Sequence, residues 1–399
     1  MQAGLPAISQ EVLIVHPTNI TKPLEGGDIR FSLDLLRKYK EQGVSVGLLG
    51  TGTTRVTVSD DGTVAVNCAK EYVWYRYLLG LGRVLLRLRT PADTVLQTTQ
   101  PLFMFPLLFL RPGNPKIVGV GAVPLEYVRL KFPFLLPFVT HLYRVVERIM
   151  VSQCECIVFF SSNLMNMFRD RYPRAITKFH IIPVGVDLTR FRRCKPSAEI
   201  LSIASLGPIV LFVGRIERVK DLSFLLTMFS TICTKRPNVQ FVIVGRGSDE
   251  TRIRSAVAKN GIPNVNFIGE IAPDRMPEVY SGARALVLAS ISEGSPAVVR
   301  EAMACGVPVV STKVGDVATT VEVGAGLIVD KVPERFAEAV LDVLEWPQST
   351  AISKCHEVAG KYSVDRIVER YVELVRRLQT DRLRGMHSTG PLGGGTDNG

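Results

Sequence analysis

The chain has 399 residues, which is more than one ordinary domain needs and enough for two of typical size. Hydrophobic residues make up 46% of it, and this share excludes wholesale disorder. The net charge of +11 favours an anionic partner, whether a phosphorylated substrate, nucleic acid or an acidic membrane surface. The seven cysteines are odd in number and include no CxxC pair, so we expect reduced thiols, not a disulfide or zinc framework.

No segment predicts a signal peptide or a membrane-spanning helix. The first apolar run, Val12–Val15, has no basic stretch before it and ends at His16-Pro17, which is typical of a strand. The longest charge-free apolar run, Pro101–Leu110, is about half of the ~20 residues that a spanning helix needs. We therefore expect a cytoplasmic protein.

Short β-branched runs alternate with amphipathic stretches in the first half, and this pattern indicates parallel α/β units. The first unit is a helix at 28–42 between strands at 12–16 and 44–49. Asp60-Asp61-Gly62 then predicts a β-hairpin turn. Further strands are expected at 94–98, 117–120, 157–160 and 180–184.

A polar, proline-containing stretch at 192–205 suits an interdomain linker, and the α/β pattern restarts after it. We expect two Rossmann-like domains, 1–195 and 196–362, with an amphipathic helix at 363–380 that packs back on the first domain and a disordered tail at 385–399. Two such halves imply a deep cleft between them, where ligands of these folds bind. The strands expected in the second half are 209–213, 239–244, 265–268, 285–289, 309–311 and 327–329, and the helices are 221–235, 249–260, 297–305 and 333–345.

The most informative segment runs from Leu286 to Val310. A strand ends near Ala289, Ser295 is predicted to cap a following helix, and Gly306 is predicted to end that helix. A helix N-terminus at the carboxyl end of a parallel strand presents free amides and a positive dipole end, so it is a natural phosphate site.

Two glutamates flank this phosphate site. Glu301 lies eight positions after Glu293, a separation of at most about 12 Å along a helix. Carboxylates accept hydrogen bonds from vicinal hydroxyls, so this layout suits a ligand with hydroxyls at both ends and phosphate between them. A nucleotide sugar has that form. The alternative is a capped surface helix with two solvated glutamates.

A second loop at a strand end faces the same cleft. It carries Gly214, Arg215 and Lys220, and two cations five residues apart can grip a diphosphate and offset its charge as it departs. The alternative is a basic surface loop in which Asp221 caps the next helix.

Here the sequence resembles family 4 of the glycosyltransferases, retaining enzymes with the two-domain GT-B fold. The likeness spans roughly residues 12–375 and is most specific in the second half. The matching motifs are Gly26-Gly27 with Arg30, Pro183-Val184-Gly185 with Asp187 and Phe191, Gly214-Arg215 with Lys220, Val244-Gly245 with Gly247, Phe267-Ile268-Gly269, the pair Glu293 and Glu301, and Gly306-Val307-Pro308.

The resemblance implies a role for each site residue. Arg215 and Lys220 would bind the diphosphate and stabilise it as it leaves, and Glu293 would hold hydroxyls of the transferred sugar. Glu301 would bind the ribose hydroxyls. The remaining donor contacts would come from the base-facing backbone of Ile268 and Gly269, from Gly27 beside the β-phosphate, and from the backbone of Gly294, Ser295, Ala297 and Val298.

The resemblance also implies metal-independent chemistry, with no cofactor apart from the nucleotide-diphosphate sugar as co-substrate. Two departures put catalysis and donor identity in question. The histidine that many members have after the strand at 117–120 is absent, and His141 is either a substitute or a structural residue. Ser295-Pro296 replaces the usual aromatic residue or glycine. A nucleotide-sugar isomerase or phosphorylase, and a non-catalytic nucleotide-sugar-binding subunit, therefore remain alternatives.

The first half contains segments in which aromatic residues, leucines and basic residues are mixed. They are residues 71–89, 101–110 and 130–142, and they are either domain core or elements that lie in a membrane interface. The second reading predicts peripheral binding to an anionic membrane on its cytoplasmic face, with a sugar or lipid-linked acceptor. Nucleic acid is not an expected partner, because no recognition motif is present and the glycine-rich stretch 50–55 leads into a hairpin, not a helix.

Overall fold

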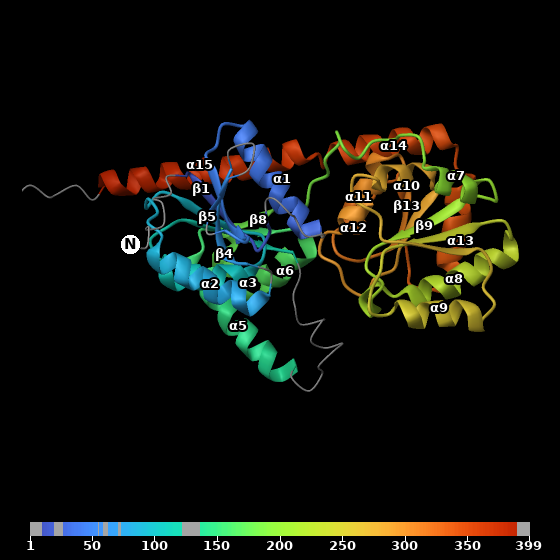
Figure 1. The fold of residues 1–399 in the computed structure, drawn as a ribbon, viewed down its shortest axis with the longest axis horizontal. Coiled ribbons are helices and arrows are strands. Elements are labelled where there is room, and N and C mark those ends of the chain that lie inside the picture. The colour runs from blue at the N-terminus through green and yellow to red at the C-terminus, as the bar shows by residue number, and fades with distance from the viewer. Residues whose placement is uncertain are drawn as a thin grey trace, which may run out of the picture.

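The computed structural model describes residues 10–19, 27–54, 56–58, 63–70, 73–121 and 136–388. Two open sheets lie side by side, each with helices on both faces (Figure 1). The expected α/β architecture with two parallel-sheet, Rossmann-like domains is confirmed. The predicted turn at 60–62 and the stretch 122–135 lie outside the described residues.

The first sheet has the order β3-β4-β2-β1-β5-β6-β7-β8, parallel except for the antiparallel β3–β4 pair. Its central strands β1, β5, β6 and β7 are fully buried, and β1 is a continuous run of Val, Leu and Ile, as is typical of a parallel sheet covered on both faces. The strands are β1 (Val12–Val15), β2 (Val46–Thr51), β3 (Val56–Val58), β4 (Val64–Ala69), β5 (Val95–Thr98), β6 (Lys116–Val120), β7 (Cys156–Phe159) and β8 (Phe179–Ile181).

Alternate residues of β1 belong to two different cores, because successive side chains of a strand point to opposite faces. Val12 and Ile14 pack under α1 (Gly27–Glu41) and α15 (Val364–Ser388). Leu13 and Val15 pack on the other face, under α2 (Trp74–Arg87), α3 (Pro101–Leu110) and α5 (Leu136–Gln153). Helix α6 (Ser162–Arg171) contributes Leu164 to this second core.

The second sheet is wholly parallel and has the order β11-β10-β9-β12-β13-β14. In chain order this is 3-2-1-4-5-6, the doubly wound arrangement of Rossmann domains. Its strands are β9 (Ile209–Val213), β10 (Gln240–Val244), β11 (Val265–Gly269), β12 (Ala285–Leu288), β13 (Val309–Thr312) and β14 (Gly326–Val329). Its helices are α7 (Ala198–Ala204), α8 (Leu222–Lys235), α9 (Glu250–Lys259), α10 (Met276–Gly282), α11 (Ala297–Ala304), α12 (Val317–Thr320), α13 (Pro333–Glu345) and α14 (Gln348–Gly360).

The chain returns to the first domain at its C-terminal end. After α14, a bridge joins Ser363 to Val186, and α15 runs beside α1 along the first domain (Figure 1). Ile367 and Tyr371 of α15 are buried in the core that β1 and α1 form. This amphipathic helix therefore covers one face of the first sheet.

Two sequence expectations need correction. The stretch 192–205 is not all linker, because it contains α7, whose Ile200 is buried in the second domain's core. The signal for this helix is Ser197, which caps it by accepting a hydrogen bond from the Ile200 amide. Helix α15 continues to Ser388, so it includes the start of the tail expected at 385–399, and residues 389–399 lie outside the described part of the chain.

None of the described helices is both long enough and apolar enough to cross a bilayer.

Candidate functional site

The strand order of the second sheet reverses between β9 and β12, which are neighbours at its centre. Ligands of doubly wound sheets bind outside the carboxyl ends of the strands at such a switch point. Here those ends carry the loop with Lys220 and the loop with Glu293. The two loops are joined because the Ile291 amide donates to the Val219 carbonyl at 2.8 Å.

Lys220 and Glu293 form an ion pair at this point. The Lys220 Nζ donates to Glu293 Oε1 at 2.5 Å, and Ser290 Oγ donates to the same oxygen at 2.7 Å. Both charged side chains are mostly buried. The two residues are 73 positions apart in sequence, and the fold brings them together. A cation and a carboxylate therefore meet at the switch point, where a ligand is expected to bind.

Arg215 is more exposed than Lys220, although the sequence motif predicts the same diphosphate-binding role for both residues. Its side chain is 74% exposed, and its Nη1 donates to Glu217 Oε1 at 2.9 Å. The preceding Gly214 has a φ of +152°, a conformation that favours glycine. Because its side chain is exposed, Arg215 can change rotamer at little cost. Lys220 is instead mostly buried in its ion pair with Glu293.

The helix that follows Glu293 begins at Ala297, as predicted, but its cap lies one residue later than predicted. Pro296 is the N-cap of α11 and has no side-chain capping bond, so Ser295 is not the cap. Its hydroxyl instead donates to Asp316 Oδ2 at 2.9 Å and accepts from the Val184 amide at 3.3 Å. The reason is tertiary: Asp316 and Val184 compete for the hydroxyl that a local cap would use.

Arg300 is not among the predicted site residues, yet it is completely buried beneath this loop. Its guanidinium forms an ion pair with Asp316, donates to Ser295 Oγ at 2.8 Å and to Thr320 Oγ1 at 3.0 Å, and lies over the Tyr362 ring. No local signal reveals this, because an arginine in an amphipathic helix normally marks the exposed side.

Glu301 is 8% exposed, and both of its carboxylate oxygens accept hydrogen bonds. Arg30 of the first domain donates to Oε1 at 2.9 Å, and the Tyr280 hydroxyl donates to Oε2 at 2.8 Å. Burial raises the pKa of Glu301 above its ordinary value, and Arg30 opposes that rise. Ribose hydroxyls that bind here must share the carboxylate with these donors or displace them.

The loop of Glu293 packs directly against the first domain. A side chain on Gly294 would meet the Gly121 carbonyl oxygen, since an added Cβ would lie 1.5 Å from it. The amide of Asn163 donates to the Gly315 carbonyl at 3.1 Å, and Ala297 contacts the core under α1 and α15. The site is thus built from both domains.

The remaining donor-binding candidates lie at element ends. Gly27 begins α1, and Ala297 and Val298 begin α11. Ile268 and Gly269 end β11, where Gly269 has a φ of +73° and its carbonyl accepts from the Gly245 amide at 2.7 Å. The residues proposed to meet the base therefore lie at the same edge of the sheet as Lys220 and Glu293.

Charged residues also join the domains beside Glu301. Arg37 of α1 donates to Asp187 at 2.7 Å, in the segment that leads into the second domain. Although burial opposes it, hydrogen bonds from Thr189 and Arg37 lower the pKa of Asp187 to about 2. Burial raises the pKa of the neighbouring Asp34 to about 6. The interface therefore contains two carboxyl groups with opposite proton affinities.

Two histidines of the first domain differ in their surroundings. His141 is exposed on α5. His16 is buried immediately after β1, where its ring meets Phe103 edge-on. Among the residues that the structure describes, no three His, Cys, Asp or Glu side chains lie together as a metal site would require.

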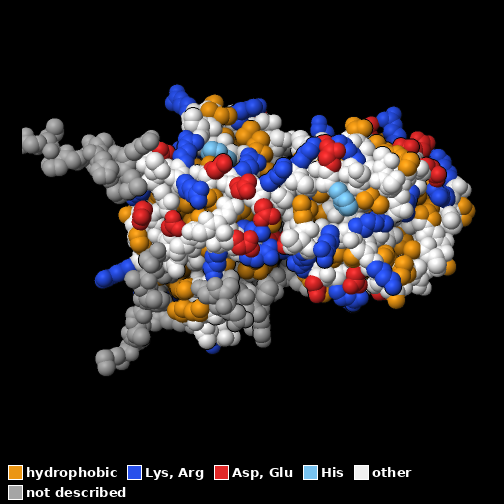
Figure 2. Space-filling model, turned by 90° about the horizontal axis from the view of Figure 1, so that it is seen from above, with side chains coloured by type: hydrophobic (Ala, Val, Ile, Leu, Met, Phe, Trp, Pro, Cys, Tyr) orange, Lys and Arg blue, Asp and Glu red, His pale blue; other side chains and the backbone are white. Residues whose placement is uncertain are grey.

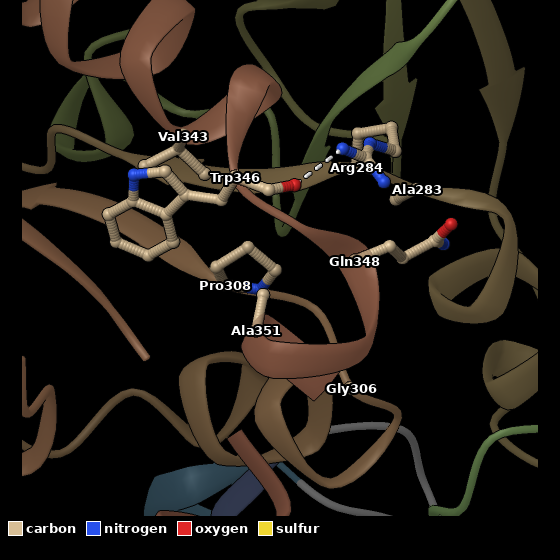
Figure 3. Close-up of a pocket in the computed structure, with 8 residues that line it drawn as sticks. All are labelled: Ala283, Arg284, Gly306, Pro308, Val343, Trp346, Gln348 and Ala351. Carbon is tan, nitrogen blue, oxygen red and sulfur yellow. Dashed lines mark hydrogen bonds between the residues drawn. The ribbon is translucent and has the colours of Figure 1, made fainter. Parts of the chain in front are cut away.

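A separate pocket lies at the opposite edge of the second sheet. Arg284 and Pro308 line it and immediately precede β12 and β13, so it is at the amino ends of those strands (Figure 3). The Arg284 Nη2 donates to the Leu344 and Trp346 carbonyls. This pocket has room for about one water molecule, and it contains none of the site residues.

Comparison with known families identifies the second domain. Residues 197–359 match the family described as glycosyl transferases group 1. This part of the chain, which forms most of the second domain, is therefore similar to that family. The match covers both loops of the site, from Gly214 to Lys220 and from Glu293 to Glu301, and it agrees with the resemblance that the sequence motifs indicate.

Curated relatives are similar over part of the chain. D-inositol 3-phosphate glycosyltransferase of Segniliparus rotundus is 32% identical over 43% of this chain and 40% of its own length. GDP-mannose-dependent monoacylated alpha-(1-6)-phosphatidylinositol monomannoside mannosyltransferase of Corynebacterium glutamicum is 25% identical over 56% of this chain and 63% of its own length. The chain thus spans less than two thirds of the length of these relatives.

Solved structures share the fold along nearly the whole chain. Sucrose-phosphate synthase of Thermosynechococcus elongatus superposes with a TM-score of 0.78 at 20% identity, covering 93% of this chain and 100% of that one. Anabaena HepE in complex with UDP-glucose has a TM-score of 0.67 at 17% identity, covering 92% and 100%. At these identities the likeness establishes the two-domain GT-B fold alone.

Proposed function

We propose that this protein is a retaining glycosyltransferase that moves a sugar from a nucleotide-diphosphate sugar to an acceptor. One observation carries the proposal: the Lys220–Glu293 pair lies at the switch point of a Rossmann domain, directly before the N-terminus of α11. That position combines a cation and a helix dipole for phosphate with a carboxylate for hydroxyls.

In the reaction, the bond between the anomeric carbon and the diphosphate oxygen breaks, and a bond from that carbon to an acceptor oxygen forms on the same face of the sugar. The acceptor hydroxyl gives its proton to the departing phosphate oxygen. Lys220 and Arg215 offset the charge that develops on the diphosphate, as donors aimed at a leaving group do. The exposed Arg215 reaches the ligand by a change of rotamer.

Glu293 and Glu301 bind the two ends of the donor. Glu293 accepts hydrogen bonds from hydroxyls of the transferred sugar. The backbone amides of Gly294, Ser295, Ala297 and Val298 meet the sugar edge or the phosphate. Glu301 accepts hydrogen bonds from the ribose hydroxyls, and the backbone of Ile268 and Gly269 lies beside the base. Anabaena HepE, which has the same fold, is described in complex with UDP-glucose, and this supports a nucleotide sugar as ligand.

We also propose an acceptor that is lipid-linked or lies at a membrane surface, which makes the protein peripheral on the cytoplasmic face. The name of the Corynebacterium glutamicum relative gives an acylated phosphatidylinositol mannoside as its acceptor, and this supports the proposal.

The test measures donor binding and transfer. A panel of UDP-, GDP- and ADP-sugars is screened by thermal shift, because a ligand that binds only the folded state stabilises it. The donor identified in this screen is then used in radiolabelled form, and its transfer to a membrane extract is measured for wild type and Lys220→Ala. We expect turnover to fall by roughly 100-fold, the scale of one lost charge-stabilising donor.

Lys235→Ala is the matched control, because Lys235 is an exposed lysine on the surface of α8 paired with Glu338. Its turnover stays at the wild-type level. Near-wild-type turnover of Lys220→Ala contradicts the assigned role. Interconversion of the free donor, or binding without turnover, contradicts a transferase and indicates an isomerase or a binding subunit.

A further inference from the structure

Three helices of the first domain lie together on the side away from α1 and α15. Helix α3 packs against both α2 and α5, and all three lie below the first sheet in the view of Figure 1. We call the outward surface of α2, α3 and α5 the three-helix face.

Helix α3 is apolar on its outward side as well as its inward side. Leu102, Phe105 and Phe109 recur at helical spacing and are exposed, and the two phenylalanine rings pack edge-on with centroids 5.1 Å apart. Phe103 and Leu107 are among the residues of the same helix that fill the core. The core therefore accounts for only one side of this helix.

The neighbouring helices extend the exposed apolar surface. On α2, Leu79 is 62% and Leu86 is 72% exposed, although Tyr77, Leu81 and Leu85 of the same helix are fully buried. Leu142 and Val145 of α5 and Tyr75 of α2 are also exposed. Large apolar side chains gathered in this way mark an interaction surface.

Charge on the three-helix face has one sign. The exposed arginines are Arg76, Arg83 and Arg87 of α2 with Arg144 and Arg148 of α5. The single carboxylate in the three helices is that of Glu147, which is buried and paired with Arg171. The surface seen in Figure 2 is different, because acidic and basic side chains are intermixed there.

We propose that the three-helix face docks on the surface of an anionic lipid bilayer. The exposed leucines and phenylalanines enter the boundary between headgroups and acyl chains, and the arginines meet lipid phosphates, as in interfacial helices. A second copy of the chain fits less well, because a two-fold interface on this face brings five arginines against the same five. The inference rests on the proposed function only for its consequence, which is that a bilayer here presents a lipid-linked acceptor to the first domain.

The apolar part is tested by co-sedimentation of the whole protein with phosphatidylglycerol–phosphatidylcholine vesicles. We expect wild type to bind, and Leu86→Gln/Phe109→Gln to lose most of the bound fraction. Leu206→Gln/Val323→Gln is the matched control, since both residues are exposed apolar side chains of the second domain. This control binds like wild type.

The cationic part is tested with Arg83→Gln/Arg87→Gln. We expect partitioning onto these vesicles to fall by about five-fold per arginine at low salt, with less loss in high salt. Arg275→Gln/Arg335→Gln removes the same net charge from the second domain and leaves partitioning unchanged. Vesicles of phosphatidylcholine alone bind wild type more weakly.

Three results overturn the docking proposal: no vesicle binding by wild type, equal binding by the face variants and their controls, or self-association that the face variants abolish. The last result assigns the face to a second copy of the chain. Nucleotide binding is measured on the same samples by calorimetry. Normal nucleotide binding with no vesicle binding rejects the membrane face alone, whereas vesicle binding without nucleotide binding rejects the proposed function alone.

Discussion

Glu293 and Glu301 differ in what already holds their carboxylates. Glu293 is paired with Lys220 in the loop before α11, where the sugar end of a donor would lie if phosphate occupies the helix N-terminus. Glu301 is inside the helix and is held by Arg30 and Tyr280. The two acids therefore meet different ends of the proposed ligand.

Calorimetry with the bare nucleoside diphosphate and with the intact donor separates their roles. We expect Glu301→Gln to weaken both ligands by about 1–3 kcal/mol, the cost of hydrogen-bonding groups left unpaired. Glu293→Gln retains affinity for the bare diphosphate but loses transfer and discriminates less between donor sugars. Glu338→Gln, a surface variant on α13, serves as control and changes neither ligand. Equal loss of diphosphate affinity in both site variants contradicts the placement.

At the scale of the element, the start of α11 depends on a buried ion pair. Arg300 and Asp316 form this pair, and Arg300 also holds Ser295, whose hydroxyl contacts Asp316 and the Val184 amide of the first domain. Removing one partner of a buried ion pair is strongly destabilising, because the remaining charge is then neither paired nor solvated. This pair therefore fixes the loop in which Glu293 lies.

Asp316→Ala is expected to lower the free energy of unfolding by about 3–5 kcal/mol, because it leaves the fully buried Arg300 unpaired. The measurement is urea denaturation, with the slope checked for a change in the denatured state. Asp330→Ala is the control, since Asp330 pairs with Arg335 on the surface and its loss has little effect. A second variant, Arg300→Met/Asp316→Ala, recovers part of the loss by removing both charges. A loss no larger than that of the control contradicts the role of the pair.

At the scale of the whole molecule, charges at the domain interface make stability depend on pH. Asp34, with a pKa raised to about 6, holds its proton more tightly in the folded than in the unfolded chain. Its contribution is complete below about pH 4 and is lost as the pH rises to about 6. Asp187, with a pKa lowered to about 2, acts oppositely and loses its contribution only as the pH falls from about 4 to 2.

Asp34→Asn tests this dependence. We expect the variant to lack much of the wild type's decline in stability between about pH 4 and 6, and to be more stable at pH 7 by up to roughly 3 kcal/mol. The decline is reduced and not abolished, because burial also raises the pKa of Glu301. Urea midpoints across this pH range provide the measurement. Parallel curves for wild type and variant refute the assignment, and Asp365→Asn, an exposed carboxylate of α15, gives the matched baseline.

Much of the fold could be predicted because its signals are local. Buried parallel strands such as Val12–Val15 and Ile209–Val213 are continuous apolar runs, and the helices between them are amphipathic. The candidate site is predicted from signals of the same kind, since Lys220 and Glu293 each follow a recognisable strand. The family match to residues 197–359 covers the loops that carry both residues.

Periodicity along the chain therefore determined the two domains, the strands and the loops that carry the site. Only the tertiary structure decided which distant groups meet: Arg30 with Glu301 across 271 positions, and Ser295 with the Val184 amide across 111. It also decided which apolar side chains of α2 and α3 fill the core and which are exposed. The physical reason is that a hydrophobic pattern records alternation within one element, whereas the partner of a buried charge and the exposure of an apolar face depend on elements far away in sequence.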